Sequence, residues 1–134
     1  MAVSIDNPDV LHAPLGLYSH VADATGSRTV FVAGQVALDR DGTLVGAGDV
    51  AAQTRQVYEN LGLALESAGA TWADVAKGTT FLVSEDLIED YFRAREETFA
   101  RLFPGGAYPA QIRALTLDVS GRTGWDGCPN LLAR

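Results

Sequence analysis

Apolar residues between positions 50 and 68 recur at intervals of three, four and seven, which is the spacing of one face of an α-helix. The stripe consists of Val50, Val57, Leu61, Ala64, Leu65 and Ala68. Asp49 precedes it, and an Asp side chain at that position accepts the free N–H groups of a first helical turn. Gly69 follows it, where glycine commonly ends a helix. The pattern predicts a helix over 49–69, about 30 Å long, whose single apolar face needs a sheet to lie on.

A second amphipathic stretch runs from about Asp86 to Phe103. Its predicted inner face contains Ile88, Tyr91, Phe92, Arg95, Phe99, Leu102 and Phe103. Ser84 offers a cap, and acidic residues gather in the first turn, where the positive end of a helix favours them. Pro104-Gly105-Gly106 follows the last apolar position and ends the helix.

Runs rich in β-branched and aromatic residues predict core strands over 29–37, 73–83 and 110–119. Residues 18–24 alternate more weakly. The turn residues Thr25-Gly26-Ser27 then predict a hairpin that joins 18–24 to 29–37.

Turn and breaker residues mark the rest of the first half. Pro8 and Pro14 predict that residues 1–16 form a loop or arm. Asp39-Arg40-Asp41-Gly42 is typical of a tight reversal. Leu44-Val45 after that turn adds a short further strand.

The predicted order is therefore two or three strands, a helix, a strand, a helix and a strand. Parallel strands need crossovers, and the two helices supply them. The fold class is α+β, a two-layer domain with a mixed β-sheet and both helices packed on one face. Since no helix remains for the other sheet face, self-association is the natural way to cover it. At 134 residues, we interpret 1–134 as a single domain.

The net charge of the chain limits the classes of partner that it can bind. Net charge is −7 and the pI is about 4.6, which argues against non-specific nucleic-acid binding. One local Arg is still enough to bind an anionic metabolite. The sequence shows no signal peptide pattern and no apolar run long enough to span a membrane. We therefore expect a cytoplasmic protein with no membrane partner and no cofactor.

A series of short motifs runs through the first helix and its flanks: Ala33-Gly34-Gln35, the Asp41-Gly42 turn, Gln53-Thr54, Glu59-Asn60-Leu61, Ala68-Gly69-Ala70 and Asp74-Val75. It continues through Lys77-Gly78-Thr79-Thr80-Phe81-Leu82 and, more weakly, from Phe99 to Phe103. Together these motifs resemble the reactive-intermediate deaminase family, RidA or YjgF, over roughly residues 14–111. The resemblance implies a RidA/chorismate mutase-like fold and a homotrimer whose sheets pack into a central barrel, with ligand clefts between subunits.

The resemblance also implies a substrate-binding set. The family uses a tyrosine near the N-terminus, a residue before Gly-Gln, an asparagine in the second helix, an arginine after Pro-Ala and a late glutamate. The corresponding positions here are Tyr18, Ala33 with Gly34, Glu96 and Gln111. A neutral amide at 111 lacks the charge that binds a carboxylate strongly.

Arg113 lies two residues beyond Gln111 and so shares its strand face. Two interpretations of Arg113 stay open: it substitutes for the missing arginine as the cation that binds the substrate carboxylate, offset by roughly 7 Å along the strand, or it is a solvated or interface charge. We keep Arg113 and Gln111 as candidate catalytic residues without assigning either.

Several other residues favour structural interpretations. We interpret Gln35 as a buried hydrogen-bonding residue or subunit contact. His12 and His20 are eight apart with no third ligand nearby, so we expect no metal site. Cys128 has no evident base and is not expected to be a nucleophile.

From Ser120 the strand pattern fails. The family has a closing strand here that carries the late glutamate, whereas residues 120–134 are irregular or an incomplete closing segment. Truncation, a divergent tail or a change of reading frame would each produce this pattern.

Three functions remain in view. The first is a hydrolase resembling 2-iminobutanoate/2-iminopropanoate deaminases, with weak activity on imino acids or enamines. The second is a non-catalytic protein that binds a small, carboxylate-bearing metabolite in its inter-subunit clefts. The third is a structural or chaperone-like trimer that acts through protein partners. The absence of the Pro-Ala-Arg pattern moves weight from the first to the second.

Overall fold

The computed structural model describes residues 2–115, and both predicted helices are present in it. They are α1 (Val50–Ser67) and α2 (Ile88–Leu102). The Asp49 carboxylate accepts a hydrogen bond from Ala52 N at 3.0 Å, which is the predicted N-cap. Gly69 has a φ of +71° just beyond α1, a left-handed conformation that favours glycine. The predicted starts and ends of α1 are therefore confirmed.

The start of α2 also follows its capping residue. Ser84 Oγ accepts a hydrogen bond from Asp86 N at 3.3 Å, at the head of a short 3-10 turn over Glu85–Leu87 that leads into the helix. Asp90 in the first turn pairs with the exposed Arg93 at 3.2 Å. These contacts agree with the predicted acidic start.

Two of the predicted core strands form a parallel pair. They are β3 (Lys77–Leu82) and β4 (Ala110–Leu115), and the chain between them passes through α2. Lys77 lies opposite Ala110, and Leu82 lies opposite Leu115. The parallel pairing through a helical crossover is confirmed. The predicted continuation of the last strand over 116–119, and the irregular segment 120–134, lie outside the described residues.

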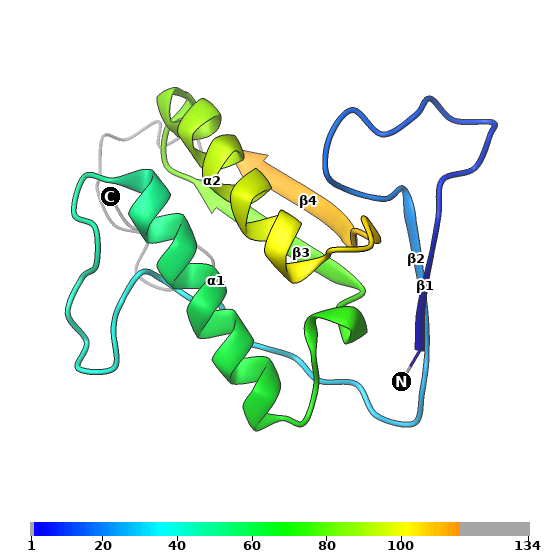
Figure 1. The fold of residues 1–134 in the computed structure, drawn as a ribbon, viewed down its shortest axis with the longest axis horizontal. Coiled ribbons are helices and arrows are strands. Elements are labelled where there is room, and N and C mark those ends of the chain that lie inside the picture. The colour runs from blue at the N-terminus through cyan, green and yellow to red at the C-terminus, as the bar shows by residue number, and fades with distance from the viewer. Residues whose placement is uncertain (1, 116–134) are drawn as a thin grey trace.

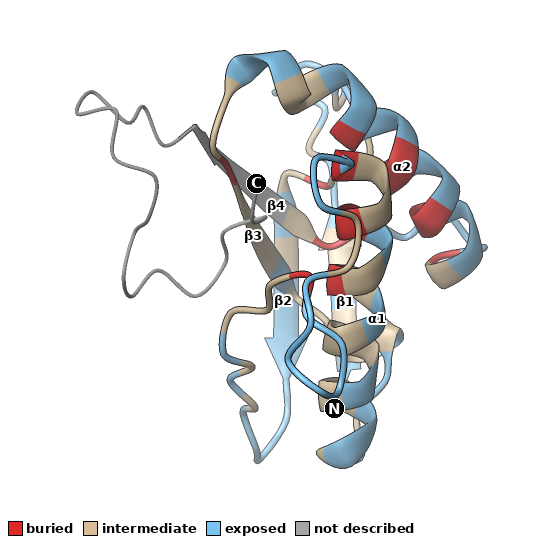
Figure 2. Ribbon diagram, turned by 90° about the vertical axis from the view of Figure 1, so that its left-hand side faces the viewer, coloured by how far each residue is buried: buried red, intermediate tan, exposed pale blue. Residues whose placement is uncertain are grey.

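The helices form one layer and β3–β4 the other. Figure 1 shows α1 and α2 side by side in front of the strand pair, and Figure 2 shows both helices on the same side of it. The core between the layers contains Ala37 and Leu82, both fully buried, with Tyr91 1% exposed. The fold class is therefore α+β, with two helices on one sheet face, as predicted.

The N-terminal strand pairing differs from the prediction. β1 (Ala2–Asp6) and β2 (Val21–Thr25) pair antiparallel, with Ala2 opposite Thr25. The predicted loop over 1–16 is thus wrong for residues 2–6. Val3 and Ile5 are half-buried and alternate with exposed neighbours, which is the period-two signal of a strand. Pro8 and Pro14 lie beyond the end of β1 and do not interrupt it.

The predicted hairpin between 18–24 and 29–37 is also wrong. Residues 29–37 belong to no strand, and Phe31 is 91% exposed. A β-rich sequence forms a strand only where neighbours bury one face of it, and here the strand that pairs with β2 is β1. Within residues 2–115 the strand pairs therefore form two separate two-stranded sheets, one antiparallel and one parallel.

The Asp39–Gly42 turn is present without the short strand predicted after it. Asp39 Oδ1 accepts hydrogen bonds from Asp41 N at 2.9 Å and from Thr43 N at 2.8 Å. Gly42 has a φ of +80°. Leu44 makes only an isolated bridge with Leu38, so the reversal ends in a loop that leads to α1.

Candidate functional site

The N-terminal loop, residues 7–20 between β1 and β2, carries Tyr18 to the start of β4. Arg95 Nη2 on α2 donates to Leu17 O, and Ser19 N donates to Pro109 O at 3.5 Å. Ser19 also bridges to Ala110. Tyr18 lies between these two attachments, one residue from each. Tyr18 is therefore held near the start of β4, the strand that contains Gln111.

Tyr18 itself is half-buried. Its hydroxyl accepts a hydrogen bond from Leu15 N at 3.4 Å, and its ring meets the His20 ring edge-on, with centroids 5.5 Å apart. The loop thus fixes the aromatic ring through its own residues. The hydroxyl retains the capacity to donate.

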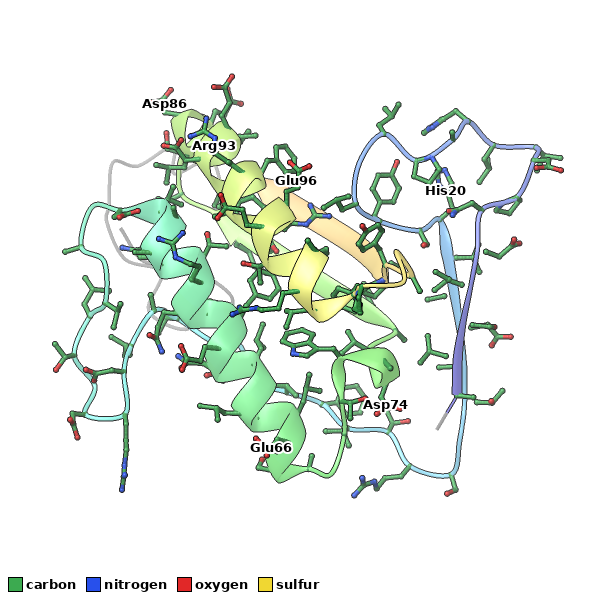
Figure 3. The ribbon with its side chains drawn as sticks, viewed as in Figure 1. His20, Glu66, Asp74, Asp86, Arg93 and Glu96 are labelled. Atoms are coloured by element: carbon green, nitrogen blue, oxygen red, sulfur yellow. The ribbon has the colours of Figure 1, made fainter. Side chains whose placement is uncertain are left out.

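Glu96 lies on α2, next to Arg95, and is exposed. Figure 3 shows it on the helix, with His20 at the base of the neighbouring N-terminal loop. Because Arg95 joins α2 to Leu17, Glu96 and Tyr18 belong to the same region. A carboxylate here is a hydrogen-bond acceptor and repels an anionic substrate, unlike the asparagine of the family pattern.

Positions 111 and 113 are placed by the β3–β4 register. Gln111 lies opposite Gly78, and Arg113 lies opposite Thr80. Two residues apart in one strand, the two positions share a strand face. The role of the two side chains stays a prediction.

Ala33 and Gly34 precede Val36, whose carbonyl accepts a hydrogen bond from Asn60 Nδ2 of α1 at 3.0 Å, and the same amide donates to Leu38 O at 2.9 Å. The half-buried Gln35 donates to Ala33 O at 3.2 Å. The loop that carries Ala33 and Gly34 is therefore attached to α1 through Val36 and Leu38.

Arg95 is a buried cation whose role the sequence reasoning did not weigh. Its side chain is only 7% exposed, and its guanidinium carbon lies 4.8 Å from the centroid of the Phe99 ring. Its Nε has no hydrogen-bond partner. The signal was present in the sequence, because an arginine occupies the apolar stripe of α2 between Tyr91 and Phe99.

A cluster of hydroxyl groups was also missed. Tyr91 Oη lies 2.9 Å from Thr80 Oγ1 and 3.5 Å from Tyr58 Oη. Burial raises the pKa of Tyr58 well above its usual value, and Tyr91 raises it further, against smaller lowering effects of Arg95 and Thr80. Tyr58 therefore keeps its proton at neutral pH. Helical periodicity placed Tyr91 on the inner face of α2, but only the folded chain brings three elements to one point.

The hydroxyl cluster borders a cavity of about 570 Å³. The cavity lies between α1, β3 and the chain from Ala24 to Gln35, and aromatic rings form much of its wall. Its size is within the range of small-molecule sites in proteins. The cavity lies within one chain, whereas the family resemblance implies a cleft between subunits.

Metal-binding side chains do not gather in the described part of the chain. Residues 2–115 contain no group of three or more His, Cys, Asp or Glu side chains placed to hold a metal ion. His20 Nε2 lies 2.8 Å from His12 O, and the two rings meet edge-on with centroids 5.1 Å apart. The two histidines thus contact each other within the N-terminal loop. Cys128 lies outside the described residues.

Within the same part of the chain, neither helix has the length and apolar character needed to cross a membrane.

The α+β fold, with two helices on one face of a parallel strand pair, defines a small class of domains. Comparison with known proteins identifies the family within this class. Residues 10–119 match the family described as Endoribonuclease L-PSP. A RutC family protein of Synechocystis is 38% identical over 100 residues, which cover 74% of this chain and 72% of that protein. A RutC family protein of Pyrococcus abyssi is 35% identical over 99 residues, with coverage of 74% and 72%.

Structural comparison gives the same result. The crystal structure of a protein of unknown function from Yersinia pestis, described as a member of the conserved Rid protein family, superposes with a TM-score of 0.73 at 31% identity. The match covers 90% of this chain and 91% of that one. The chain belongs to the endoribonuclease L-PSP family, which is the RidA/YjgF family. The resemblance seen in the sequence motifs is confirmed.

Proposed function

We propose that this protein binds a small, carboxylate-bearing metabolite in clefts between the subunits of a homotrimer, and that it has weak 2-imino acid or enamine deaminase activity. In that reaction a water adds to the imine carbon and ammonia leaves, so that a 2-oxo acid forms. The observation that carries the proposal is the combination of family membership with the register that places Arg113 two residues beyond Gln111 on one strand.

The weakness of the activity follows from position 111. A carboxylate held by an arginine receives two charge-assisted hydrogen bonds, and a glutamine cannot supply them. Hydrogen bonds to charged groups contribute about 1.5–3 kcal/mol. Their loss from the transition state corresponds to roughly ten- to a hundredfold in turnover efficiency. Arg113 supplies the remaining positive charge at the cleft.

The deciding experiment measures ammonia release from a freshly generated 2-imino acid, with and without the protein, above the spontaneous rate. Gln111→Arg should raise turnover, and Arg113→Ala should abolish what is present. Arg40→Ala is the matched control, because Arg40 lies in the exposed Asp39–Gly42 turn. Turnover at the level of an arginine-containing relative, unchanged by Arg113→Ala, would show that neither residue has the proposed role.

The same variants separate catalysis from binding. If the cleft only binds a metabolite, Gln111→Arg changes the affinity for a 2-oxo acid such as pyruvate and leaves ammonia release at background. This outcome would retain the binding site and reject the deaminase activity.

A structural or chaperone-like trimer that acts through protein partners is the alternative. It is favoured by large apolar side chains at the surface of the described residues. Val10 is 90% exposed, Leu15 is 87% exposed and Phe31 is 91% exposed. Apolar groups of this size at a surface favour contacts between proteins. Normal trimer formation with neither ammonia release nor metabolite binding would support this alternative.

A further inference from the structure

The lining of the cavity between the helices and β3 includes both aromatic rings and a cluster of hydroxyl groups, and the charged residues Arg28, Asp74 and Lys77 lie along it as well. Trp72, Phe99 and Phe103 contribute aromatic rings to it, and Tyr58, Tyr91 and Thr80 contribute hydroxyl groups. The rings contact one another edge-on, with centroids 5.9 Å apart for Trp72 and Phe103 and 5.0 Å apart for Phe99 and Phe103. Such a wall accepts a planar apolar body, because edge-to-face and offset contacts are the preferred aromatic geometries.

The hydroxyl cluster has one more proton than its internal bonds use. Three hydroxyls carry three protons, and the two contacts that Tyr91 makes with Thr80 and Tyr58 use two of them. Whichever way the two bonds run, one O–H remains to donate. All three residues line the cavity, so this donor is available to a group inside it.

The Tyr58 hydroxyl keeps its proton across the physiological range. Burial, and next Tyr91, hold the pKa of Tyr58 well above its usual value. An ionised tyrosine would be an acceptor only. The cluster therefore favours a ligand atom that accepts a hydrogen bond, such as a carbonyl or ether oxygen.

We propose that this cavity is a second binding site, within a single subunit, for an aromatic or alicyclic molecule that bears a hydrogen-bond-accepting oxygen. The ring lies among Trp72, Phe99 and Phe103, and the oxygen accepts the spare proton of the Tyr58–Tyr91–Thr80 cluster. The test below changes Tyr58, Thr80 and Tyr91, whereas the test of the proposed deaminase activity changes Gln111 and Arg113, so the two proposals can fail separately.

The test uses two probes of the same shape, acetophenone and α-methylstyrene. Acetophenone has a carbonyl oxygen where α-methylstyrene has a CH₂ group. Both dissociation constants are measured by ligand-observed NMR titration on the unmodified protein and on the triple variant Tyr58→Phe, Thr80→Val, Tyr91→Phe, which removes all three hydroxyls and keeps the side-chain shapes. All three are changed together because any one remaining hydroxyl still has a proton to donate.

The triple variant should bind acetophenone about three- to tenfold more weakly, the effect of one neutral hydrogen bond, and should bind α-methylstyrene at least as tightly as before. Tyr108→Phe is the matched control. Its ring stacks on Phe99 at 5.9 Å outside the cavity lining, and neither affinity should change. Equal losses for both probes, or no saturable binding of either, would overturn the proposal.

Two further measurements apply if the triple variant does not fold. Nuclear Overhauser contacts between acetophenone and the Trp72 indole should appear in the unmodified protein. Ala76→Phe, which places a ring in the cavity lining, should abolish binding of both probes. Binding without contacts to Trp72, or undiminished binding to a folded Ala76→Phe protein, would place the probe elsewhere and reject the site.

Discussion

The guanidinium carbon of Arg95 lies 4.8 Å from the centroid of the Phe99 ring, one helical turn further along α2. Within the described residues the one ion pair joins Arg93 to Asp90. No carboxylate in that part of the chain therefore lies within 4 Å of the buried Arg95 guanidinium. The ring face offsets part of the cost of burying the charge. The Nη2 bond to Leu17 O offsets more. Arg95 is thus retained where an apolar residue would fit the stripe, and it fastens the N-terminal loop to α2.

Replacement of Arg95 by Met should separate these two effects. Met keeps the apolar stem and removes a buried charge without an acidic partner, so the free energy of unfolding should fall by no more than about 1 kcal/mol, or rise. The N-terminal loop, having lost its bond to α2, should be cleaved faster by a protease. Denaturant unfolding and limited proteolysis measure the two effects.

Arg93→Met, at the exposed ion pair, is the control; it should leave both the free energy of unfolding and the rate of proteolysis unchanged. A decrease of 3 kcal/mol or more in the free energy of unfolding of Arg95→Met would contradict this prediction, because it would mean that the contacts of the Arg95 guanidinium fully offset the cost of burying its charge.

Leu82→Ala should be among the most destabilising truncations in the chain. Leu82 has no exposed surface and belongs to the core cluster with Tyr91. Removal of a buried Leu side chain costs roughly 2–5 kcal/mol. Leu63→Ala is the control, since Leu63 is 59% exposed and should change stability by less than about 0.5 kcal/mol. Similar melting temperatures for the two variants would mean that the strand β3 does not face the helices.

The cap of α1 gives a comparison between two substitutions at one residue. Asp49→Ala removes the acceptor for Ala52 N and should cost about 0.5–2 kcal/mol. Asp49→Asn keeps an acceptor oxygen and should cost only a few tenths. Unfolding in urea distinguishes them. Equal losses in both variants would assign the effect to charge at the helix end rather than to the hydrogen bond.

Much of this arrangement was predictable from local sequence. The caps Asp49 and Ser84, the glycine at 69 and the two stripes act within a few residues, so periodicity placed α1 and α2 correctly. The parallel β3–β4 pair followed because a helix separates two β-rich runs. The partner of β2 was not predictable, since residues 2–6 and 29–37 both carry strand-like patterns and the choice depends on which one the folded chain buries.

The residues of the candidate site, like the elements of the fold, were predictable to different degrees from local sequence. Tyr18 lies near the start of β4, the strand that contains Gln111, and the loop that follows Ala33 and Gly34 is hydrogen-bonded to α1 through Val36 and Leu38. The role of Arg95 depends on a carbonyl at Leu17, far away in sequence. The Tyr58–Tyr91–Thr80 cluster joins two helices and a strand. Contacts of this kind have no local sequence period, so only the folded chain shows them.

Tyr58 gives a prediction at alkaline pH. Its pKa is raised in the folded state by burial and by Tyr91. Its contribution to stability is therefore fully present below the unfolded-state value of about 10 and is lost as pH rises through the folded-state value. Absorbance at 295 nm should show the late ionisation of Tyr58, at a pH above its unfolded-state pKa. Tyr58→Phe should remove that step, and Tyr18→Phe should retain it. A late step that persists in Tyr58→Phe would assign it to another tyrosine.

Sedimentation equilibrium should give a mass of three times the 14.2 kDa chain. The expectation rests on the apolar surface that includes Phe31, 91% exposed, because burial of such side chains in a subunit interface is favourable. Phe31→Glu should shift the equilibrium towards smaller species. Leu63→Glu, on the outer face of α1, should leave it unchanged. A stable monomer of the unmodified chain in dilute buffer would contradict the trimer and the inter-subunit cleft together.

The parallel pairing of β3 and β4 also determines the order in which these elements fold: α2 comes before the strand pair. A strand pair of this kind cannot close through a tight turn, so the whole of α2 has to fold back before Lys77 meets Ala110. Helical contacts form faster than pairings between distant segments. During synthesis, β3 therefore leaves the ribosome with the edge that receives β4 still open, and it stays open while α2 is being made. In that interval the chain is most exposed to pairing with a neighbouring copy.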